Sequence, residues 1–207
     1  MIFITRLIGI NLILLNLSSI FFPLRNKDIN LLEMYPKNFI SPSSAIKLLN
    51  QKQLNSVETL RVVNDTINRT MTHFNSSKRR EKFKYNLIAP IHENYILFAL
   101  SFLHEKLQPW EIYNYRKAII RGVGLCSQHA IIADQVLKRK KIPAKLIGLN
   151  GHVVVTAEVS KNKWWILDPD YGVILPFDIK EIEKDPSLIT TFYLAKGYTQ
   201  EKVSLLK

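Results

Sequence analysis

Hydrophobic residues between positions 56 and 74 recur every three or four residues, which is typical of one apolar face of a helix. The positions on this face are Val57, Leu60, Val63, Ile67, Met71 and Phe74. We expect this helix to begin near Ser56, with Glu58 in its first turn, where a negative charge is favoured by the helix dipole. It should end before the polar residues 75–77. Residues 25–85 are interpreted as a helical lead-in that packs on the domain that follows.

Three more helical patterns follow the lead-in region. They are expected over about residues 94–106, 109–121 and 126–141. The second pattern places Trp110, Tyr113 and Ile119 on its apolar side, and Gly122-Val123-Gly124 interrupts it. Pro143 ends the third helix, because proline lacks the N–H that a helix interior needs.

The hydrophobic pattern changes to that of strands after Pro143. Expected strands cover residues 144–149, 152–159, 164–167 and 173–175. Asn150-Gly151 is a strong hairpin signal, residues 160–163 form a second turn, and Asp168-Pro169 closes the third strand. Helices followed by an antiparallel sheet indicate an α+β fold for the domain at residues 86–207.

Residues 1–24 have the apolar character of a membrane-targeting segment. The unbroken apolar stretch from Leu7 to Phe22 is shorter than the roughly 20 residues of a membrane span, so it suits a signal sequence or a short signal anchor. No small-x-small cleavage site precedes Pro23, which favours an uncleaved anchor. We therefore expect a membrane-associated, extracytoplasmic single-pass protein. A buried core helix is the alternative interpretation.

Composition fits one folded domain with a basic surface. The chain has 207 residues, of which 47% are hydrophobic and 22% charged, so it can bury a core and is not expected to be disordered. Lys and Arg number 29 against 17 Asp and Glu, a formal charge of +12. Basic runs at 78–84 and 138–141 make an anionic polymer, such as a cell-surface polysaccharide, a possible partner. A solvated basic face is the alternative, and no motif indicates a specific nucleic-acid partner.

Cys126 is the only cysteine, which excludes an intramolecular disulfide and a multi-cysteine zinc site. The glycine-containing turn before it delivers the thiol to the start of a helix, where unpaired N–H groups lower a thiol pKa. The same N–H groups can form an oxyanion hole. His152 begins one expected strand and Asp168 ends its antiparallel neighbour, so the hairpin brings these two residues together. Cys126, His152 and Asp168 are therefore the candidate nucleophile, base and orienting acid.

Cys126 and His152 also allow two other interpretations, a structural thiol and a metal site. A lone cysteine is often a buried structural thiol. His129 lies three residues after Cys126 on the same helix face, but a metal site formed by Cys126, His129 and His152 has no standard spacing. We therefore expect no metal and no organic cofactor.

Four segments resemble, in order, the nucleophile segment, the helix-to-sheet bend, the histidine strand and the aspartate strand of the transglutaminase-like superfamily. They are residues 121–130, 142–145, 151–155 and 163–169. The resemblance covers roughly residues 92–176. It implies a papain-like α+β fold and a bacterial-type, membrane-associated member of the superfamily.

The resemblance also implies cysteine-dependent acyl transfer or amide hydrolysis through a thioester. Cys126, His152 and Asp168 would form the triad, and a protein or peptide amide would be the substrate. The alternative is a catalytically silent binding or assembly module at a membrane, which keeps the fold but not the activity.

Overall fold

The computed structural model describes residues 10–11, 14, 38–52, 55–74, 87–89, 93, 95–103, 110–149 and 151–204. The expected anchor at 1–24, apart from Ile10, Asn11 and Leu14, and the whole basic run at 78–84 lie outside the described residues. Among the residues that are described, no helix has both the length and the apolar character needed to cross a bilayer.

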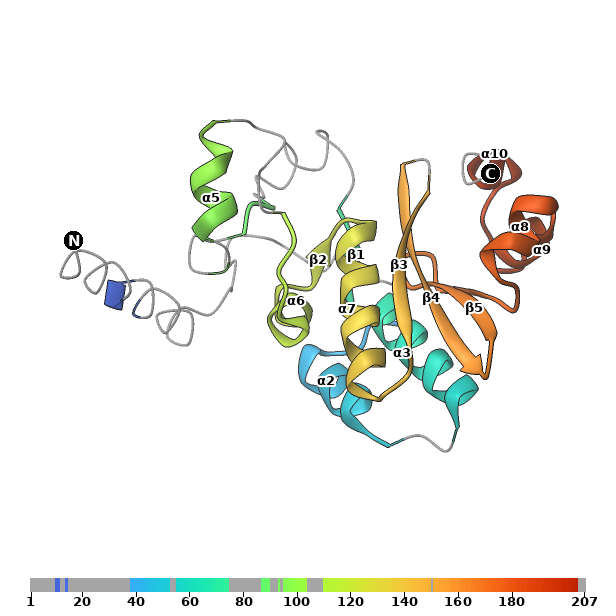
Figure 1. The fold of residues 1–207 in the computed structure, drawn as a ribbon, viewed down its shortest axis with the longest axis horizontal. Helices are drawn as coiled ribbons and strands as arrows, with labels where there is room; N and C mark the ends of the chain where they lie inside the picture. Colours follow the sequence, from blue (N-terminus) through green and yellow to red (C-terminus); the bar gives the residue numbers. More distant parts are fainter. Residues whose placement is uncertain are drawn as a thin grey trace.

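Residues 144–175 form a four-stranded antiparallel sheet (Figure 1). Its strands, in spatial order, are β3 (Ala144–Leu149), β4 (His152–Ser160), β5 (Lys163–Asp168) and β6 (Val173–Leu175). Leu149 pairs with His152 across the first hairpin, and Val155 pairs with Leu167 between β4 and β5. The expected strands, their hairpin order and the mixture of helix and sheet are confirmed.

The two faces of this sheet belong to two separate apolar clusters, because side chains alternate along each strand. Val155 and Leu167 face a core that also contains α7 (Cys126–Arg139), whereas Val154 and Ile166 face a smaller core under the C-terminal helices. Those helices are α8 (Ile179–Lys184), α9 (Leu188–Ala195) and α10 (Gln200–Ser204). In Figure 1, strands β3 to β5 lie between α7 and these three helices.

The lead-in helices share the larger core. They are α2 (Pro42–Asn50) and α3 (Ser56–Thr70). Leu49 of α2 and Leu60 of α3 are buried in the same cluster as Ile132 and Leu137 of α7. The expected start of α3 is confirmed, since Asn55 caps it by accepting a 2.8 Å hydrogen bond from the Glu58 N–H.

The expected end of this helix at Phe74 is wrong. The α3 helix stops at Thr70, and strand β1 (Thr72–His73) pairs in parallel with β2 (Val123–Gly124). Met71 and Phe74 are buried, but they come directly before and after this strand. Their spacing of three residues is also that of a helical turn, which explains the wrong prediction. The pairing partner lies about fifty residues away in sequence, and local periodicity carries no information about it.

The expected helix at 109–121 also begins too early. Helix α6 (Tyr115–Arg121) starts after Asn114, whose side chain accepts hydrogen bonds from the Arg116 and Lys117 N–H groups. Ile119 is buried as expected, but Tyr113 is 80% exposed and does not join the core. The backbone at Ile112 is not helical, because it forms hydrogen bonds with the Gln128 side chain of α7. The first expected helix is seen as α5 (Tyr95–Ser101).

Candidate active site

Cys126 is the first residue of α7, and its thiol is free and half-buried. The N-cap residue Leu125 provides no side-chain cap, and the Gln128 N–H makes the first bond of the helix, to the Leu125 carbonyl at 3.0 Å. The N–H groups of Cys126 and Ser127 therefore lie at the positive end of the helix dipole. This setting favours a negatively charged oxygen next to Cys126.

The segment before Cys126 is fixed on both sides. The Thr72 and Phe74 N–H groups donate to the carbonyls of Gly122 and Gly124, each at 2.8 Å. A Cβ atom at Gly124 would lie 2.5 Å from the Cβ atom of Gln128, so only glycine fits there. The nucleophile thus enters α7 from a backbone that has little freedom.

Gln128 is the side chain that locks this first turn. Its Oε1 accepts from the Ile112 N–H at 2.7 Å and from Arg121 Nη2 at 2.9 Å, and its Nε2 donates to the Ile112 carbonyl at 3.0 Å. These bonds hold the backbone at residue 112 in a non-helical form, which explains the late start of α6. Gln128 and Arg121 are both buried, so these bonds satisfy polar groups that water cannot reach.

His152 and Asp168 are joined directly. The His152 Nε2–H donates to Asp168 Oδ2 at 2.7 Å, and the side chains are 7% and 0% exposed. Asp168 Oδ2 also accepts from the Tyr193 hydroxyl at 2.7 Å, and Oδ1 accepts from the Tyr171 N–H at 3.1 Å. Both oxygens of the buried carboxylate are therefore paired, and the imidazole is held by a fixed acceptor.

Electrostatics link His152 to Cys126 as well as to Asp168. Burial lowers the pKa of His152, but hydrogen bonds to Asp168 and Cys126, together with their negative charges, raise its pKa to about 10. His152 is therefore an imidazolium at neutral pH. Because Nε2 is bonded to Asp168, Nδ1 is the nitrogen left for Cys126. The structure thus brings the three residues selected from the sequence into one chain of contacts.

Three tyrosines enclose the buried side of this pair. The Tyr171 ring stands perpendicular to the His152 ring, with centroids 5.1 Å apart, and it contacts the rings of Tyr193 and Tyr198 at 5.7 and 4.8 Å. Burial raises the pKa of Tyr171 and of Tyr198 to about 12, and burial also raises the pKa of Tyr193. All three remain neutral phenols, which shield Asp168 from water. The contact of Tyr193 with Asp168 could not be predicted from the sequence, because no periodic pattern relates α9 to the triad.

A second acid, Asp170, lies two residues after Asp168. Its Oδ2 accepts from His73 Nδ1 at 2.6 Å, and its Oδ1 lies 3.7 Å from His129 Nε2. The His129 Nδ1–H donates to the Leu125 carbonyl at 2.8 Å, next to the nucleophile. Burial is the main reason why the pKa of His129 is lowered, so this ring is neutral at pH 7.

The loop that carries Asp170 is tied to α3. Asn68 Nδ2 donates to the carbonyls of Pro169 and Asp170, at 3.2 and 2.9 Å. Gly172 has a φ of +68°, and a Cβ atom there would lie 2.8 Å from the Asn68 side chain. The turn at residues 170–172 therefore places a charged group beside the site.

The metal alternative finds no support within the described part of the chain, where no group of three or more His, Cys, Asp or Glu residues can hold a metal ion. His129 instead binds a backbone carbonyl and faces Asp170.

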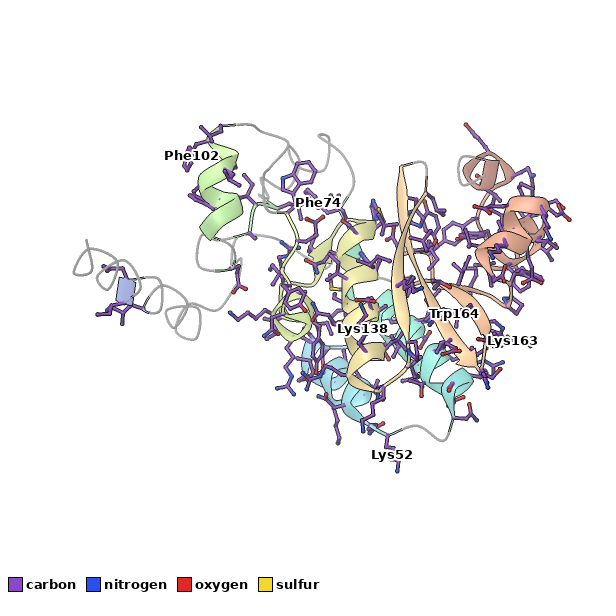
Figure 2. All side chains as sticks on the ribbon, in the orientation of Figure 1. Lys52, Phe74, Phe102, Lys138, Lys163 and Trp164 are labelled. Carbon is purple, nitrogen blue, oxygen red and sulfur yellow. The ribbon has the colours of Figure 1, made fainter. Side chains whose placement is uncertain are left out.

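The described basic run, residues 138–141, lies at the far end of α7. Lys138 pairs with Asp134 at 2.8 Å, and Lys140 donates to the Gln51 carbonyl at 2.5 Å. Figure 2 shows Lys52, next to this contact, and Phe74, next to the nucleophile segment, on opposite sides of the domain. A partner bound by this run would be remote from Cys126.

Comparison with known protein families gave no match for this chain, and comparison with curated proteins found none that is similar.

Proposed function

We propose that this protein is a cysteine enzyme that transfers acyl groups or hydrolyses amides through a thioester at Cys126. The supporting observations are the 2.7 Å hydrogen bond between His152 and Asp168 and the electrostatic interaction that raises the pKa of His152 beside Cys126. A base that is itself oriented by a third group is the arrangement that activates cysteine nucleophiles.

We also propose a papain-like arrangement of the fold, as the sequence resemblance to the transglutaminase-like superfamily implies. A helix that begins with the cysteine packs on an antiparallel sheet, and the sheet supplies the histidine and the aspartate. The fold would then serve to hold the start of α7 against the first residue of β4.

In the first half-reaction, the Cys126 thiolate attacks the carbonyl carbon of an amide or ester. The N–H groups at the start of α7 stabilise the oxyanion that develops. His152 gives its Nδ1 proton to the leaving group, the carbon–leaving group bond breaks, and a thioester to Cys126 remains. Asp168 holds the imidazole in place throughout.

In the second half-reaction, water or an amine attacks the thioester. Attack by water completes a protease or amidase reaction, and attack by an amine completes a transglutaminase reaction. A protein or peptide amide is the substrate implied by the sequence resemblance. Residues 1–24 would place this reaction at a membrane, outside the cytoplasm, and the basic runs would face an anionic polymer there.

The test uses p-nitrophenyl acetate as an acyl donor. Intact-mass and peptide analysis should find one acetyl group, bound as a thioester to Cys126, and Cys126→Ala should abolish it. Addition of butylamine during turnover separates the two outcomes, since a transferase yields N-butylacetamide in preference to acetate. If the folded wild-type protein forms no thioester faster than free cysteine does, the proposal is wrong and the binding-module alternative is favoured.

A further inference from the structure

The cluster around Asp170 contains an acid–histidine pair that the mechanism above does not use. The Asp170 side chain is 3% exposed, and His73 Nδ1 lies 2.6 Å from its Oδ2. Asp170 Oδ1 is buried and has no hydrogen-bond partner among the described residues, although His129 Nε2 is 3.7 Å away. Leaving an oxygen of a buried carboxylate without a hydrogen bond costs free energy, so such a group in a folded protein calls for an explanation.

The hydrogen-bonding roles in this pair can be assigned. Burial alone would raise the pKa of Asp170, but its interactions with His129 and His73 lower it, so the carboxylate is ionised and can only accept. His73 Nδ1 must then carry the hydrogen of this bond, so Nε2 is the ring nitrogen that would accept a proton. Asp170 orients His73 as Asp168 orients His152.

The position of His73 places it beside the nucleophile. In the β1–β2 pairing, His73 is the partner of Gly124, two residues before Cys126. Its ring stacks on that of His129, in the first turn of α7, with centroids 6.3 Å apart. Asp170 Oδ1 lies 3.7 Å from His129 Nε2, so the pair of Asp170 and His73 adjoins the first turn of α7.

The three histidines of this region differ in their exposure to solvent. The His73 side chain is 31% exposed, whereas His152 and His129 are 7% and 1% exposed. A molecule from solvent can therefore meet the His73 ring. In the free enzyme the raised pKa of His152 keeps this residue protonated, which suits it to donate a proton in the first half-reaction.

We propose that His73, held by Asp170, is the base that takes the proton from the hydroxyl or amine acceptor, or from water, that attacks the Cys126 thioester. This inference rests on the proposed function. It assigns the two half-reactions to different histidines.

The second half-reaction would transfer the proton of the acceptor to His73. After the first half-reaction, His152 regains a proton from solvent. The acceptor then forms a bond from its oxygen or nitrogen to the thioester carbon, its proton moves to His73 Nε2, and the carbon–sulfur bond breaks. The Cys126 thiolate re-forms beside the His152 imidazolium, and His73 releases its proton to solvent.

Stopped-flow hydrolysis of p-nitrophenyl acetate tests this division, because nitrophenolate release shows a burst for acylation and a steady rate for deacylation. In His73→Gln the burst rate should stay within about twofold of wild type. The steady rate should fall on the order of 100-fold, the usual contribution of one general base. Hydroxylamine, which attacks thioesters without a base, should restore the steady rate. His152→Gln should instead lose the burst.

The matched control is Arg69→Gln, on the exposed surface of α3 just before β1, where the guanidinium binds Asp65 and the Asn38 carbonyl. Both phases should be unchanged in this variant. Asp170→Asn gives a second test, with the same selective loss of the steady rate and the same rescue, and it decides the matter if His73→Gln does not fold.

Three results would overturn the inference. Unchanged kinetics in His73→Gln would mean that His73 takes no part in deacylation. Equal losses in both phases, without rescue by hydroxylamine, would mean that His73 only supports β1. Absence of a burst in the wild-type protein would remove the proposed function itself, and this inference with it.

Discussion

Replacing Gly124 with alanine tests how tightly the structure holds the nucleophile segment. The new methyl carbon would lie 2.5 Å from Gln128 Cβ and 2.7 Å from Gln128 Cγ, whereas ordinary contacts begin near 3.4 Å. Gln128 cannot yield easily, because its amide makes three hydrogen bonds to Ile112 and Arg121. The clash therefore falls on the backbone before Cys126 or on this buried network.

Both ways of relieving the clash cost free energy. Overpacking typically costs about 1–3 kcal/mol, and each broken hydrogen bond costs about 0.5–1.5 kcal/mol more. We expect Gly124→Ala to lower the free energy of unfolding by about 2–5 kcal/mol. Gly148→Ala is the matched control, since a Cβ atom there meets nothing within 4 Å, and it should change stability by less than about 0.5 kcal/mol.

Urea unfolding followed by tryptophan fluorescence measures both variants. If Gly124→Ala is as stable as Gly148→Ala, the close approach of β2 to Gln128 is wrong, and so is the reason given for a glycine at this position.

Further predictions concern the groups around the triad. Tyr193→Phe removes a hydroxyl that donates to the buried Asp168 carboxylate, and it should lower unfolding free energy by about 1.5–3 kcal/mol in urea titrations. Tyr198→Phe loses a bond to a neutral carbonyl and should cost less, so a reversed order would contradict the geometry. Asn68→Ala removes two bonds to the loop after β5 and should cost about 1–3 kcal/mol, with faster amide exchange in that loop; unchanged exchange would refute the tether. Because the pKa of His152 is raised from 6.5 to about 10, its contribution to stability is complete below about pH 6.5 and is lost as pH rises through about 10. Urea midpoints of wild type should therefore fall over this range more steeply than those of His152→Gln, and parallel curves would argue against the shift.

The sheet and the pairing of His152 with Asp168 were predictable because their determinants are local. The sequence Asn150-Gly151 predicts the first hairpin, and the strand lengths then bring the start of β4 to the end of β5. The turn before Cys126 likewise gives the nucleophile its place at a helix start. These features follow from neighbouring residues, without knowledge of the rest of the chain.

The features that the sequence interpretation missed depend on distant partners. Strand β1 forms only because Thr72 and His73 meet β2, and the same pairing brings His73 to the site. Tyr193 reaches Asp168 because the C-terminal helices cover the second face of the sheet. A single sequence shows no periodic signal for contacts of this kind. Asp170 lies in a turn, and its contact with His73 appears only once β1 pairs with β2.

The most direct test of the activated thiol is the pH dependence of Cys126 alkylation by iodoacetamide, in the wild-type protein and in His152→Gln. An ordinary thiol loses reactivity as pH falls below its pKa of about 8.5. The wild-type protein should still react rapidly near pH 6, because His152 stabilises the thiolate, and His152→Gln should return to the ordinary profile. Slow alkylation at pH 6 that is the same in both proteins would show that Cys126 and His152 are not an activated pair, and the proposed enzyme would have no nucleophile.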